Sequence, residues 1–62
     1  MFTINTIAHE IETLIASAID YENRSKQYRT FGDIEKANQC KEIANEAKRS
    51  AEALTAFLAR QH

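Results

Sequence analysis

Few side chains in this 62-residue sequence could do chemistry. His9 and Glu12 stand one helical turn apart, a spacing that can place two metal ligands together, but a metal site needs three or four. The other histidine, His62, lies in the opposite half of the chain. We therefore expect a solvated pair at His9, no metal site and no bound cofactor.

The remaining reactive groups also fail to form a catalytic set. Cys40 is the only cysteine, so it has no disulfide partner within the chain, and its position on an apolar stripe predicts a small core residue rather than a nucleophile. Tyr21 and Tyr28 lie on a similar stripe, and we expect their hydroxyls to reach its edge. A single glycine, Gly32, cannot form a phosphate-binding loop. The sequence therefore predicts a protein that is not an enzyme.

Basic residues near the middle of the chain are the main signal for nucleic acid. The segment 21–30 carries a net charge of +2, whereas 1–20 carries −3. Phosphate contacts from such a cluster would favour RNA or DNA binding. Acidic residues are interleaved with it, however, and the whole chain has a net charge of −1 and a pI of about 6.1. A solvated face of mixed charge is thus the competing interpretation. The candidate contacts are Arg24, Lys26, Arg29 and Lys36.

The side chains discussed above lie on two predicted helices of nearly equal length. Apolar or small residues recur at alternating steps of three and four on both sides of Gly32, and the chain has no proline. The pattern predicts an all-α, antiparallel two-helix hairpin as a single domain over 1–62, with helices at about 4–30 and 34–59 and a turn at 31–33.

Capping residues support these boundaries. Gly32 can adopt the left-handed conformation that ends a helix, and Asp33 is a favourable N-cap for the next one. Thr3, Asn5 and Thr6 are alternative N-caps for the first helix, among which the sequence does not choose.

The spacing of the small residues indicates how the helices pack. Alanine recurs every seventh residue in the second helix, and small side chains allow two helix axes to approach closely. Alternatively, these alanines are simply good helix formers. Large apolar residues flank both stripes, and a lone hairpin would leave several of them in water. We therefore expect a homodimer forming a four-helix bundle; the alternative is a monomeric hairpin within a larger complex. The expected dimer interface is Ile11, Leu14, Ala44, Ala47, Ala51 and Leu54.

Size and composition favour the same view. A chain of this length can bury only a marginal hydrophobic core. Because the sequence predicts neither a disulfide nor a metal site, association with a partner subunit is the expected source of extra stability. We expect no signal peptide, since the N-terminus lacks a basic region and a cleavage pattern, and no membrane span. A lone thiol favours a reducing, cytoplasmic location.

The two equal helices, the tight turn and the small residues Ala37, Ala44 and Ala51 with Leu54 resemble the Rop family of plasmid RNA-binding regulators. That resemblance implies a dimeric bundle whose first helices contact RNA. In this chain, the early turns of the first helix carry Glu10 and Glu12 on the outer side, without basic partners. We therefore assign none of the family's RNA-binding residues to this sequence. In size and organisation the chain is also similar to small accessory proteins of lambdoid phage early regions, which implies a regulatory role directed at the host.

The leading expectation is a small regulatory or adaptor protein that binds another protein as a homodimer. The alternative is a Rop-type bundle that binds RNA or DNA.

Overall fold

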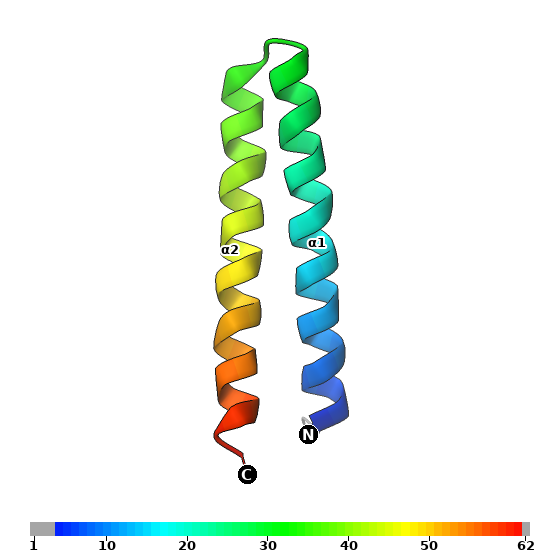
Figure 1. Ribbon diagram of the computed structural model, residues 1–62, viewed down its shortest axis with the longest axis vertical. Coiled ribbons are helices and arrows are strands. Elements are labelled where there is room, and N and C mark those ends of the chain that lie inside the picture. The colour runs from blue at the N-terminus through cyan, green and yellow to red at the C-terminus, as the bar shows by residue number, and fades with distance from the viewer. Residues whose placement is uncertain (1–3, 62) are drawn as a thin grey trace.

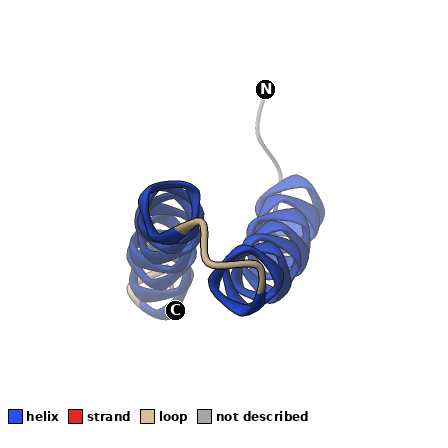
Figure 2. Ribbon diagram, turned by 90° about the horizontal axis from the view of Figure 1, so that it is seen from above, coloured by secondary structure: helices blue, strands red, loops and turns tan. Residues whose placement is uncertain are grey.

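The computed structural model describes residues 4–61 and shows an antiparallel helical hairpin (Figures 1 and 2). Helix α1 spans Ile4–Thr30 and helix α2 spans Ile34–Ala59. The two helices lie side by side along their whole length, in an outline of 47 × 15 × 15 Å. The predicted all-α hairpin is confirmed.

The turn is built by the residues that the sequence singled out. Gly32 has a φ of +84°, the left-handed conformation that residues with a Cβ adopt only under strain. The Asp33 carboxylate accepts a hydrogen bond from the backbone N–H of Lys36, so Asp33 caps α2 (N···O distance 3.2 Å). The Asp33 N–H in turn donates to the carbonyl of Tyr28 at the end of α1 (2.9 Å). These bonds reverse the chain within three residues.

The observed start of α1 excludes two of the three residues that the sequence offered as its N-cap. Asn5 and Thr6 lie inside the first turn of α1, which begins at Ile4, so neither is its N-cap. Thr3, the third candidate, lies outside the described residues.

The core between the helices consists of small side chains. Among the residues that the structure describes, six are buried, and all of them are small: Ala18, Ser25, Ala37, Cys40, Ala44 and Ala51. The Ser25 hydroxyl donates a 2.7 Å hydrogen bond across the seam to the carbonyl of Ala37, which satisfies the one polar side chain in this group. Small residues at these positions allow α1 and α2 to approach closely.

Because the seam is so narrow, it covers no large side chain completely. Within residues 4–61, no large side chain is fully buried, and seven large apolar residues are exposed by more than a third of their surface. In this part of the chain, neither helix combines the length and the apolar character needed to cross a bilayer.

Candidate interaction surface

The hairpin has two broad faces, one on each side of the plane that contains its helices. Helical periodicity places one set of residues on the first face, which we name the tyrosine face: Ile7, Leu14, Tyr21, Tyr28, Ile43, Ala47, Leu54 and Phe57. The opposite face, named the lysine face, carries Ile15, Glu22, Lys26, Arg29, Lys41, Lys48 and Glu52. The lysine face carries more charged side chains than the tyrosine face, whose charged neighbours are Glu10, Arg24 and Lys36.

Apolar and aromatic side chains recur along the tyrosine face from the turn to the open end of the hairpin. Ile43 and Phe57 keep 43% and 42% of their surface exposed, and the other members are half-buried. Near the open end, Ile7, Leu54 and Phe57 line an open groove of about 560 Å³. Contiguous apolar surface of this kind marks an interaction site in soluble proteins.

Charged residues also lie on or beside the tyrosine face, near its two ends. Glu10 lines the rim of the groove near the open end. Nearer the turn, the Arg24 guanidinium lies 5.1 Å from the centre of the Tyr21 ring, and the Lys36 ammonium lies 5.6 Å from that of Tyr28. Both distances are typical of cation–π contacts. The margin is therefore acidic near the open end and basic near the turn.

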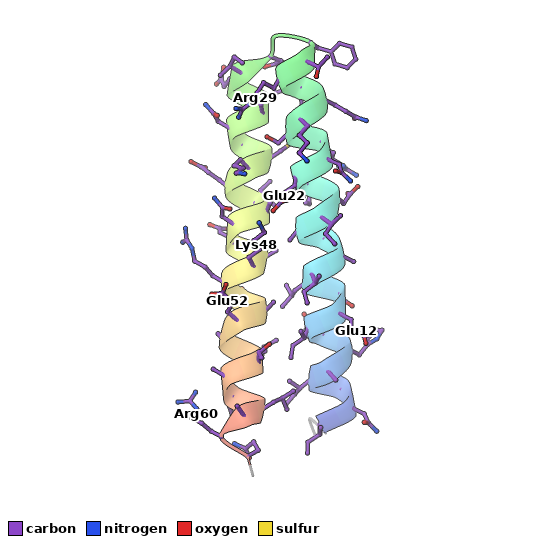
Figure 3. All side chains as sticks on the ribbon, viewed as in Figure 1. Glu12, Glu22, Arg29, Lys48, Glu52 and Arg60 are labelled. Carbon is purple, nitrogen blue, oxygen red and sulfur yellow. The ribbon has the colours of Figure 1, made fainter. Side chains whose placement is uncertain are left out.

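The lysine face combines charged residues with an apolar hollow of about 460 Å³ beside Ile15, and it holds the one ion pair between the two helices among the described residues. Figure 3 shows Glu22 from α1 and Lys48 from α2 pointing toward each other, whereas Glu12 lies on the outer side of α1. The hydrogen bond from Lys48 holds the pKa of the Glu22 carboxyl below its usual value, against the opposing effect of burial, and the nearby Lys41 and Lys26 contribute. Glu22 therefore stays ionised.

A further hollow of the hairpin lies on the lysine face, toward the turn. It has a volume of about 200 Å³ and is lined by Glu22, Ser25, Lys26, Arg29 and Lys41. Three cations surround one carboxylate there, which makes the local charge positive.

The structure divides the expected interface residues between two environments. Ala44 is completely buried and Ala51 is 5% exposed, because both pack against α1 of the same chain. Ile11, Leu14, Ala47 and Leu54 are half-buried and keep surface that a second chain can cover. Three of these four, all but Ile11, belong to the tyrosine face.

The four expected nucleic-acid contacts do not form one patch. Lys26 and Arg29 lie on the lysine face, whereas Arg24 and Lys36 lie at the margin of the tyrosine face beside the two aromatic rings. Arg24 also pairs with Asp20 at 3.1 Å. Lys41, which the sequence reasoning missed, joins Lys26 and Arg29. Counting equal steps outward from Gly32 would have placed Lys41 at the level of Asn23, next to Glu22 and one turn from Lys26.

The other candidates for chemistry lie apart from one another. Cys40 is buried as a free thiol in the seam, and His9 is exposed on α1. Within residues 4–61, no three histidine, cysteine, aspartate or glutamate side chains come together as a metal site would require. His62 lies outside the described residues.

Comparisons with protein-family models, curated proteins and solved structures find no match to this chain. We take the tyrosine face as the candidate functional surface because of its partly exposed apolar side chains and its groove.

Proposed function

We propose that this chain is a non-enzymatic homodimer that acts through protein–protein interaction, as a small regulator or adaptor. The supporting observation is the mismatch between a core of small side chains and the large apolar side chains that stay partly exposed along one face. A second copy would cover Ile43, Leu54 and Phe57, which one hairpin leaves partly in water. Burying a large apolar side chain fully stabilises by roughly 1.5–3 kcal/mol relative to leaving it exposed.

The dimensions of the hairpin allow an interface of ordinary size. Its outline, 47 Å by 15 Å, has a projected area of about 700 Å² on one side. A second copy that covered the whole outline would bring the total to about 1,400 Å², within the ~1,200–2,000 Å² of standard specific interfaces. The resulting object is a four-helix bundle with its large side chains at the centre.

A pair of matched substitutions tests the dimer and its location. Ile43→Lys places an ammonium group in the middle of the tyrosine face, and two-fold symmetry places it there twice. Ile19→Lys makes the same change at an isoleucine of α1 that is 57% exposed and lies outside that face. Sedimentation equilibrium should show a dissociation constant at least tenfold higher for Ile43→Lys and little change for Ile19→Lys. Equal dissociation constants for the two variants would refute this surface as the interface.

The adaptor role requires a further protein partner on the surface that the dimer leaves free. Affinity capture from the native cell extract should recover one protein reproducibly and in stoichiometric amount. The Ile19→Lys variant, which we expect to remain dimeric, serves as a second bait with its change outside the tyrosine face. Failure to recover any reproducible protein with the wild-type dimer would count against the adaptor role.

A second candidate function is supported by the positive hollow on the lysine face. Lys26, Arg29 and Lys41 could contact successive phosphates of RNA or DNA, as in the Rop-type alternative. In a mobility-shift titration, binding by these groups should weaken steeply as salt rises and should fall with Lys41→Gln. The absence of any shift at low salt would remove this candidate.

A further inference from the structure

We propose that two copies pack tyrosine face on tyrosine face about a two-fold axis at mid-length, so that their turns lie at opposite ends of the bundle. This inference rests on the proposed homodimer and defines its geometry. The occupant of the tyrosine face is thus a second copy running in the reverse direction.

The first support is the position of two small residues. Ser17 lies 13 residues before the end of α1, and Ala47 lies 13 residues after the start of α2, so both stand at the same level of the hairpin. Both are half-buried, and helical periodicity directs both toward the tyrosine face. Large side chains flank them on the same face, with Leu14 and Tyr21 on α1 and Ile43 on α2. Two hairpins can therefore approach most closely at this level.

The second support is charge complementarity about that level. A two-fold axis at the level of Ser17 stacks α1 of one copy antiparallel on α1 of the other. A residue a given number of steps before Ser17 in one copy then lies beside the residue the same number of steps after Ser17 in the other. Glu10 lies seven residues before Ser17, and Arg24 lies seven residues after it. The axis therefore brings Glu10 of one copy beside Arg24 of the other, twice in the dimer. Arg24 uses one donor on Asp20 and has others to offer.

The apolar residues obey the same reversal. To within one residue, Leu14 meets Tyr21 of the second copy and Ile7 meets its Tyr28. Each pairing sets an aliphatic side chain against an aromatic one. In α2, a centre at Ala47 brings Phe57 to within one residue of Lys36, which can lie over its ring.

The competing arrangement, with both turns at one end, lacks this complementarity. It would stack α1 of one copy on α2 of the other at equal levels. Glu10 shares its level with Leu54 and Phe57, since the three line one groove. Its carboxylate would then be pressed against apolar side chains of the second copy without a cation, which is unfavourable.

A distance between the two turns tests the arrangement. Phe31 is 82% exposed at the turn and accepts a spin label as Phe31→Cys, in a Cys40→Ala background that removes the native thiol. The label lies 14 residues from the level of Ser17, which is about 21 Å at 1.5 Å per residue. Double electron–electron resonance should therefore give a label separation of about 40 Å.

The distance measurement separates the arrangement of the two copies from the existence of the dimer. A separation of less than about 20 Å, the width of two adjacent hairpins, would keep the dimer and overturn the arrangement. A dipolar signal indistinguishable from background, with a monomer mass for the labelled chain, would overturn the proposed homodimer itself.

Charge reversal gives an independent test. Glu10→Arg and Arg24→Glu should each weaken the dimer several-fold, and the double variant should recover most of the loss because the pair is restored in reverse. Glu12→Arg, on the outer side of α1, is the control and should leave the dissociation constant unchanged. A double variant as weak as the sum of the two single changes would contradict the pairing.

Discussion

The close approach of α1 and α2 makes Ala44 a position of the core that tolerates no larger side chain. Ala44 has no exposed surface, and its neighbours on the same stripe, Ala37 and Ala51, are 0% and 5% exposed. Ala44→Leu adds three carbon atoms where the seam has no room, so the helices must separate or the side chain must leave its preferred rotamers. Such overpacking costs ~1–3 kcal/mol. For a chain of this size each kcal/mol lowers the melting temperature by roughly 4–8 °C.

A matched control separates steric cost from helix propensity. Ala53→Leu makes the same change on the exposed side of α2, where surface substitutions alter stability by less than ~0.5 kcal/mol. Urea unfolding of both variants and the wild type at one protein concentration measures the difference. The reasoning would be refuted if Ala44→Leu were as stable as Ala53→Leu, because the alanine seam would then not be closely packed.

Three further substitutions probe the turn, the ion pair and the seam. Gly32→Ala should lower the free energy of unfolding by ~1 kcal/mol because its φ is +84°, and Gly32→Asn should cost less, since asparagine tolerates that conformation; equal losses in urea unfolding would contradict this. Folding lowers the pKa of Glu22, so its contribution to the free energy of unfolding is complete above about pH 4.5 and is lost as the pH falls below that value. Glu22→Gln should therefore flatten the acid side of a plot of melting temperature against pH. The control Glu42→Gln, at an exposed position, should give the same plot as the wild type. Ser25→Ala removes the buried hydrogen bond to the carbonyl of Ala37 in α2 and should cost ~1 kcal/mol in urea unfolding; an unchanged free energy of unfolding would contradict this.

Local signals made the hairpin predictable from the sequence. Gly32 and Asp33 mark the turn because one residue tolerates a left-handed backbone and the other caps a helix with its own carboxylate. The recurrence of small residues every seven positions identified the buried stripe, which the structure confirms at Ala37, Ala44 and Ala51.

The assignment of residues to surfaces was harder to predict. Heptad spacing shows that Ala44 and Leu54 share a stripe, but not whether the same chain or a second chain covers them. The structure shows Ala44 covered by α1 and Leu54 still accessible. Likewise, proximity in the sequence grouped Arg24 with Lys26, although two steps along a helix turn one side chain about 200° from the other. Pairing across the seam, such as Glu22 with Lys48, depends on the register of the hairpin and not on local sequence.

The self-association of the tyrosine face is the claim on which the proposed function depends. Sedimentation equilibrium of the unmodified chain over a dilution series tests it most directly. The chain has a mass of 7.1 kDa, so the predicted result is a particle of twice that mass that dissociates on dilution. A particle of 7.1 kDa at every concentration, with a sharp cooperative melting transition, would show that one hairpin is stable alone and would contradict the dimer.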